Sequence, residues 1–125
     1  MAKILGIGGI FFKANDSQAL SDWYKEVLGI DIGECGAVFK PESVPENGYT
    51  AFGIFKGDTK YFDVPDKSSQ QAFMINFLVD DLHSMLAQIE ANGGTLVGEP
   101  EEYDYGMFGW FADPEGNKVE LWQAK

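Results

Sequence analysis

The segment at residues 105–123, YGMFGWFADPEGNKVELWQ, constrains the fold of this chain more than any other stretch. Two apolar runs flank the sequence DPEGN at residues 113–117. Pro114 fixes its own φ angle and Gly116 supplies a position at which positive φ carries no steric cost. Strand-like sequence on both sides of such a turn predicts a β-hairpin with a short loop.

The second strand of this hairpin, KVELW at residues 118–122, alternates in side-chain type. Successive side chains of a strand point to opposite faces of the sheet. Val119 and Leu121 are therefore expected on one face, and Glu120 and Trp122 on the other. A carboxylate beside an indole is typical of a ligand cleft, because clefts combine apolar walls with few polar groups.

The composition predicts one ordinary globular domain of 125 residues, with 45% hydrophobic and 23% charged residues. The sequence contains no apolar run of the ~18 residues that a membrane span needs. The N-terminal apolar stretch lacks a small-x-small cleavage site and is interpreted as a strand, so we expect a cytoplasmic protein. The net charge of −11 argues against nucleic-acid binding, which depends on cationic side chains.

Turn residues and apolar periodicity divide the chain into two similar halves. In the first half, Asp16 or Asn15 caps a predicted helix that Gly29 ends, and in the second half Asp80 and Asp81 cap another. The predicted strands lie at residues 3–13, 30–40, 49–55, 59–64, 73–79, 95–97, 105–112 and 118–123. The order is βαβββ, a polar linker, and βαβββ.

A shift of 65 residues aligns the two halves, with Ile10 on Ile75 and Gly29 on Gly94. This pattern indicates an internal duplication. We therefore predict an α+β fold, in which two βαβββ modules in tandem form one domain around a shared cleft. Module one spans residues 3–64, the linker 65–71 and module two 72–123.

The only cysteine and the only histidine are both interpreted as structural residues. Cys35 lies in an alternating apolar segment without a nearby cation, so a buried strand position is expected rather than a nucleophile. His83 lies in the first turn of the second predicted helix, and we expect it on the helix surface.

Four stretches of the chain carry a resemblance to a known family. They are ALSDWYKEVLG at 19–29, FLVDDL at 77–82, GMFGWF at 106–111 and DPEGNKVELW at 113–122. With these motifs the chain resembles the vicinal oxygen chelate superfamily, which includes glyoxalase I, bleomycin-resistance proteins and extradiol dioxygenases. The resemblance implies the glyoxalase/bleomycin-resistance fold over nearly the whole chain.

Enzymes of this superfamily hold a divalent metal with side chains from the first and last strands of each module. The resemblance places these ligand positions at Gly9, Met74 and Glu120, with a fourth close to Asp63. Glycine has no ligand atom, and a thioether is a poor ligand for hard or borderline divalent ions. We therefore expect no functional metal site and no other cofactor, with Glu120 as the candidate catalytic residue.

Strand alternation from the ligand positions predicts which residues face the cleft. Phe11 and Asn76 share the face of Gly9 and Met74, and either Trp110 or Phe108 faces the cleft from the neighbouring strand. The predicted ligand-binding residues are Phe11, Met74, Asn76, Trp110, Glu120 and Trp122. Such a pocket suits a small aromatic or amphipathic molecule, including a cationic one.

Three functions remain open from the sequence, and catalysis itself is undecided among them. The first is a glyoxalase/bleomycin-resistance-like protein that binds a small molecule without a metal. The second is a lyase or isomerase related to lactoylglutathione lyase with an atypical metal site. The third is a non-catalytic structural module. The resemblance also implies a homodimer.

Overall fold

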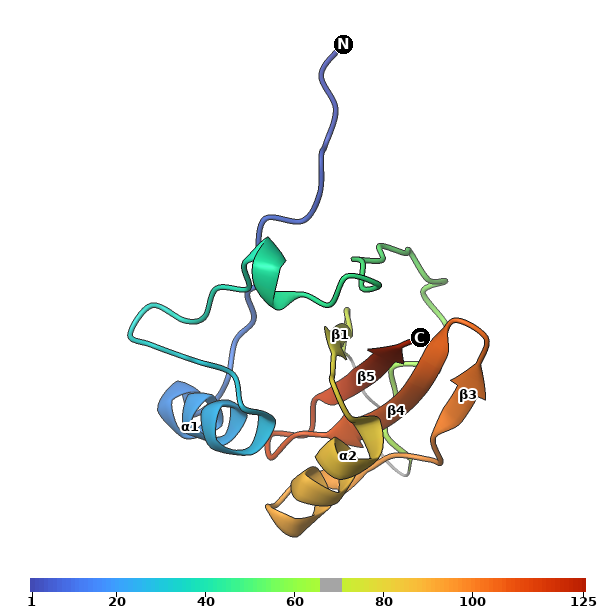
Figure 1. Cartoon of the computed structure of the whole chain (residues 1–125). Helices are drawn as coiled ribbons and strands as arrows, with labels where there is room; N and C mark the ends of the chain where they lie inside the picture. Colours follow the sequence, from blue (N-terminus) through green and yellow to red (C-terminus); the bar gives the residue numbers. More distant parts are fainter. Residues whose placement is uncertain (66–70) are drawn as a thin grey trace.

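The computed structural model describes residues 1–65 and 71–125 of the chain. It has an α+β fold in which α2 packs on one face of a five-stranded sheet and α1 packs beside α2 (Figure 1). The elements are α1 (Ser17–Leu28), η1 (Pro41–Ser43), β1 (Ile75–Leu78), α2 (Leu82–Ala91), β2 (Thr95–Leu96), β3 (Glu101–Tyr103), β4 (Gly106–Ala112) and β5 (Lys118–Ala124). The α+β class predicted from the sequence is confirmed.

The sheet has the strand order β1-β5-β4-β2, with β3 pairing to β4 beyond this path. The hairpin predicted around DPEGN is the antiparallel pair of β4 and β5, which closes at Ala112 and Lys118. β1 pairs with β5 in parallel, so that Asn76 lies opposite Glu120. This register brings the first and last strands of module two side by side, with β1 at the edge of the sheet.

The apolar core lies between the helices and the face of the sheet that carries Val119 and Leu121, as the alternation predicts. Phe111 on β4 and Ile89 on α2 are both fully buried in this core. Burying a large apolar side chain stabilises the fold by about 1.5–3 kcal/mol relative to leaving it exposed. The opposite face of the sheet therefore remains available for polar and aromatic residues.

The two helices begin and end with the same hydrogen bonds. Asp16 caps α1 by accepting from the amide of Ala19, and Asp81 caps α2 by accepting from the amide of Ser84. At the other ends, the amides of Gly29 and Gly94 donate to carbonyls five residues earlier, those of Tyr24 and Ile89. These pairs are related by the 65-residue shift, so the helices carry the clearest trace of the duplication.

The DPEGN turn contacts helix α1 through two carboxylates. Asp113 is buried and accepts four hydrogen bonds, one of them from the Tyr24 hydroxyl at 2.8 Å. Glu115 accepts from the backbone amides of Asn15 and Asp16, at 2.7 and 2.9 Å, just before the helix begins. A carboxylate at a helix N-terminus is favourable, because the free amides there carry partial positive charge.

The first half of the chain differs from the prediction. Residues 3–13, 30–40, 49–55 and 59–64 were predicted as strands, but within the described residues 1–65 the regular elements are α1 and η1 alone. The bridge positions described there are Gly33 with Gly36, and Val64. A strand needs a neighbour for its backbone hydrogen bonds, and the glycines of these segments weaken strand formation further.

The residues before α1 extend away from the body of the molecule (Figure 1). Every residue from 1 to 13 is exposed, among them Leu5 and Phe11. Cys35 is also exposed and lies in the turn between Gly33 and Gly36, so the prediction of a buried strand residue was wrong. No described strand pairs with residues 1–13 or with the turn that holds Cys35, so both remain exposed.

Two further differences concern module two and the linker. The short strand β3, which pairs with β4 through a turn at residues 104–105, was not predicted, because its sequence Glu101-Glu102-Tyr103 has no apolar alternation. The predicted linker lies mostly outside the described residues, and the module boundaries stay a prediction. Within the described ranges, no helix has the length and apolar character to cross a membrane.

The buried pair of Tyr24 and Asp113 is expected to stabilise the fold. Replacing Tyr24 with Phe removes one donor from a buried carboxylate, so the free energy of unfolding in urea should fall by about 1–2 kcal/mol. Tyr103→Phe is the matched control, because Tyr103 also donates to a carboxylate, that of Glu101, but at an exposed site. Equal midpoints for both variants would contradict a stabilising role for the buried pair.

Candidate functional site

The sheet face opposite the helices carries a carboxylate with three neutral hydrogen-bond donors. Asn76 on β1 donates to one oxygen of Glu120 at 2.6 Å. Trp110 on β4 donates its indole N–H to the other oxygen at 2.8 Å, and the Tyr61 hydroxyl donates to that same oxygen at 2.6 Å. The registers of β1 and β4 against β5 place Asn76 and Trp110 directly opposite Glu120, which explains their convergence.

Tyr61 belongs to the last part of module one and lies outside the strands of the sheet. Its ring stands edge-on to Trp110, with ring centroids 6.4 Å apart and planes at 87°. The amino group of Lys118 lies 5.0 Å from the centre of the Tyr61 ring and also donates to the Tyr61 backbone carbonyl. The phenol thus contacts a carboxylate, an indole and a cation at once.

Burial and Glu120 together raise the pKa of the Tyr61 hydroxyl. Burial disfavours the phenolate, and the hydrogen bond and negative charge of Glu120 disfavour it further. Burial lowers the pKa of Lys118, while the charges of Glu120 and Asp63 oppose that shift. At neutral pH, Tyr61 is therefore a hydrogen-bond donor to Glu120 rather than a base.

A cavity of about 730 Å³ lies beside this cluster. Tyr61 and Trp110 line it, together with Lys118, whereas Glu120, which accepts from both aromatic residues, is not among its lining residues. Three carboxylate side chains also line the cavity, so its border is more acidic than basic. These are Asp63, Glu99 and Glu101, against Lys60 and Lys118.

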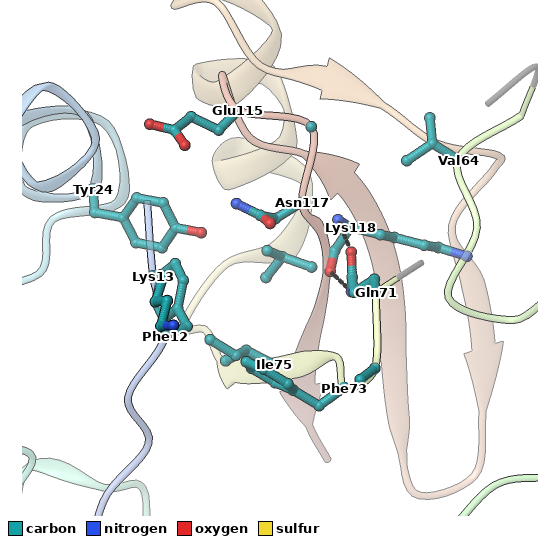
Figure 2. Close-up of a pocket in the computed structure, with 13 residues that line it drawn as sticks. Phe12, Lys13, Tyr24, Val64, Gln71, Phe73, Ile75, Glu115, Asn117 and Lys118 are labelled. Atoms are coloured by element: carbon teal, nitrogen blue, oxygen red, sulfur yellow. Dashed lines mark hydrogen bonds between the residues drawn. The ribbon is translucent and has the colours of Figure 1, made fainter. Parts of the chain in front are cut away.

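A second cavity, of about 420 Å³, lies where the N-terminal segment meets the DPEGN turn (Figure 2). Phe12 and Tyr24 line it from module one, and Ile75 and Asn117 from module two. Figure 2 shows Lys118 extending away from these residues toward the segment that holds Val64. The residues around this cavity mainly hold the two halves of the chain together.

Four of the predicted ligand-binding residues lie on one sheet face. Asn76 and Trp110 both donate to Glu120, and Trp110 rather than Phe108 lies opposite Glu120. Trp122 shares the face but is only 5% exposed. It is covered by Phe108 and by Tyr49, with ring centroids 6.1 and 4.6 Å away.

The structure does not bring the other predicted residues to this cluster. Phe11 is 91% exposed in the extended N-terminal segment, and Gly9 lies in the same segment. Met74 is half-buried just before β1 and lines neither cavity. His83 is exposed on α2, as expected.

Sequence reasoning missed the roles of Tyr61 and Lys118. The segment of Tyr61 was selected by the family pattern, but a chain without strand pairing does not alternate, so no register identified the residue. Lys118 was treated only as a strand residue, although it is buried and lies two residues before Glu120 in the chain. Lysine is rarely buried without a partner, and aromatic rings and carboxylates are its usual partners.

Residues 9–122 match the family model described as a glyoxalase-like domain. The chain therefore belongs to the glyoxalase-like domain family, within the vicinal oxygen chelate superfamily. A curated relative, the uncharacterized protein YetH of Bacillus subtilis (strain 168), is 26% identical over 115 residues, covering 89% of this chain and 92% of YetH.

Solved structures support the same fold. TnmS3, an antibiotic binding protein from Streptomyces sp. CB03234, is 17% identical over the full length of both chains, with a TM-score of 0.58. A member of the glyoxalase/bleomycin resistance protein/dioxygenase superfamily from Sphaerobacter thermophilus is 19% identical, covers 96% of this chain and 98% of its own, and has a TM-score of 0.55. At these identities the likeness concerns the fold alone.

The contact between Tyr61 and Glu120 predicts a change in tyrosine ionisation. In Glu120→Gln the negative charge is lost, so the pKa of Tyr61 should fall relative to the wild type while burial keeps it above the ordinary value of about 10. Phenolate absorbance measured during alkaline titration follows this change, and Tyr61→Phe identifies which transition belongs to Tyr61.

The control is Glu102→Gln, which removes a carboxylate that pairs with Lys125 on the sheet surface. We expect its Tyr61 transition to match the wild type. A Glu120→Gln titration indistinguishable from both would show that Tyr61 and Glu120 are not in contact in solution.

Proposed function

We propose that this chain is a glyoxalase/bleomycin-resistance-like protein that binds a small aromatic or amphipathic molecule, without a functional metal, in the cleft beside Trp110 and Glu120. The observation that carries this proposal is that three neutral donors hold Glu120 in place beside an open cavity. A carboxylate held in this way is a fixed acceptor and a fixed negative charge for an aromatic or cationic ligand.

The donor set near Glu120 does not fit a divalent metal. Of the positions implied by the family pattern, Gly9 has no ligand atom and Met74 has a thioether, which leaves Glu120 and Asp63. Both oxygens of Glu120 already accept hydrogen bonds from uncharged side chains. Among the residues at 1–65 and 71–125, no group of three or more His, Cys, Asp or Glu side chains has a metal-binding arrangement.

The fold relative TnmS3 supports a binding role by analogy, since it is described as an antibiotic binding protein. The walls of the cavity suit such a role in this chain, because Trp110 and Tyr61 supply aromatic surface and the carboxylates around them favour a cation. The alternative function, that of a lyase or isomerase with an atypical metal site, has Glu120 as its one matching residue.

Binding of the planar aromatic cation berberine to EDTA-treated protein tests the proposed function. We expect berberine fluorescence to rise with wild-type protein, and Glu120→Gln to weaken binding by about tenfold, because a partly desolvated carboxylate–cation contact contributes about 1–2 kcal/mol. Glu102→Gln, an exposed carboxylate on the sheet edge, is the matched control and should bind as the wild type does.

Metal analysis of the untagged protein completes this test. Zinc, nickel or iron at near-stoichiometric amounts, lost in Glu120→Gln, would overturn the metal-free function and favour the lyase or isomerase. Unchanged berberine fluorescence with every variant would overturn the binding function.

We further propose that the chain forms a homodimer. A compact folded monomer of 13.8 kDa exposes about 6,600 Å². This chain exposes 9343 Å², about 40% more, and much of that surface is apolar. The excess is larger than the ~800 Å² that each partner buries in a standard interface. The exposed apolar side chains of residues 4–12 are the surface that a second copy would cover.

Light scattering coupled to size-exclusion chromatography tests the dimer. We expect the wild type at twice the chain mass. Leu5→Glu should shift the equilibrium toward the monomer, because Leu5 is 89% exposed and apolar in the single chain. Lys3→Glu lies on the same segment without removing apolar surface and should leave the mass unchanged. A monomeric wild type would refute the dimer.

A further inference from the structure

Two tyrosines of the chain donate to carboxylates in different surroundings. Tyr24 is 5% exposed, and its partner Asp113 is buried in the turn that holds the two halves of the chain together. Tyr61 is 40% exposed, yet its hydroxyl lies 2.6 Å from Glu120 at the border of a cavity. Tyr24 is therefore part of the core, whereas Tyr61 lies at the candidate site beside Glu120.

The backbone around Tyr61 is held to the sheet by few contacts. Among the described residues, the backbone hydrogen bonds of residues 59–63 stay within the segment or reach back to Lys56. The hydrogen bonds to the sheet pass through side chains, from the Tyr61 hydroxyl to Glu120 and from Lys118 to the Tyr61 carbonyl. A side chain held in this way moves without breaking a strand ladder.

The Tyr61 ring lines the cavity and contacts Glu120 through its hydroxyl. Tyr61 and Trp110 line the cavity, while Glu120, which accepts from both, does not. Asn76 and Trp110 are fixed by the sheet and remain bonded to Glu120 if Tyr61 moves. Displacement of Tyr61 would then free the acceptor position of Glu120 that the Tyr61 hydroxyl occupies.

The groups that contact the Tyr61 phenol indicate which kind of ligand could take its place. At the position of the Tyr61 ring, Glu120 accepts a hydrogen bond from a hydroxyl, and the Trp110 indole makes a perpendicular ring contact. The cavity beside it is lined by more carboxylates than lysines. A hydroxyaryl group that carries a cationic substituent matches each of these features. A ligand without the hydroxyl would leave the open acceptor of Glu120 unpaired.

We infer that Tyr61 occupies the ligand position of this site, and that the ligand is a phenol-bearing aromatic cation that displaces Tyr61 and donates its hydroxyl to Glu120 in its place. This inference rests on the proposed function and names the ligand class of the same cleft. Tyr61 then sets both the specificity and the affinity of the site, because each ligand must replace its hydrogen bond.

Binding of tyramine and of its O-methyl derivative, measured by calorimetry, tests the inference. Both amines carry the same cation, but only tyramine can donate a phenolic hydrogen bond. Tyramine should bind about tenfold more tightly than the derivative, and in Glu120→Gln this ratio should fall toward one. Tyr61→Phe should tighten both ligands about tenfold over the wild type, because the competing hydroxyl is gone.

Tyr49→Phe is the matched control, because Tyr49 packs on Trp122 at the same face of the sheet. It should leave both affinities unchanged, and thermal melting verifies that each variant is folded. Equal binding of the two amines by Tyr61→Phe, or no gain over the wild type, would overturn the inference. If berberine still binds in that case, the ligand occupies the cavity beside Tyr61 and the proposed function stands; if it does not, both fall.

Discussion

The buried carboxylate of Asp113 is the contact on which the rest of the structure depends. An ionised carboxylate removed from water is costly unless its oxygens accept several hydrogen bonds. Asp113 accepts two backbone amides and one side-chain amide from its own turn, and the fourth donor is the Tyr24 hydroxyl of helix α1. The turn that joins β4 to β5 is therefore also the joint between the two halves of the chain.

Glu120 is the second carboxylate with several donors, and the comparison explains its different role. Both groups accept a tyrosine hydroxyl, but at Asp113 three of the four donors belong to one rigid turn. At Glu120 the donors come from β1, from β4 and from a segment outside the sheet. A tyrosine–carboxylate hydrogen bond therefore stabilises the fold at Asp113, whereas at Glu120 it is a contact that a ligand could replace.

Features that depend on residues close together in the chain could be predicted from the sequence, whereas features that depend on distant residues could not. The DPEGN hairpin, both helix caps and the alternation of β5 depend on neighbours within a few residues, and all are present. The strands predicted in module one depend on partners far away in the chain, and their apolar alternation does not specify which edge they pair with. The contact of Tyr61 with Glu120 spans 59 residues and was beyond any local pattern.

The unpaired first module connects the fold to the site. Its helix α1 is held by Asp113 and Glu115 of the DPEGN turn, while residues 1–13 remain exposed. Tyr61 comes from the last part of this module and reaches Glu120 without joining a strand ladder.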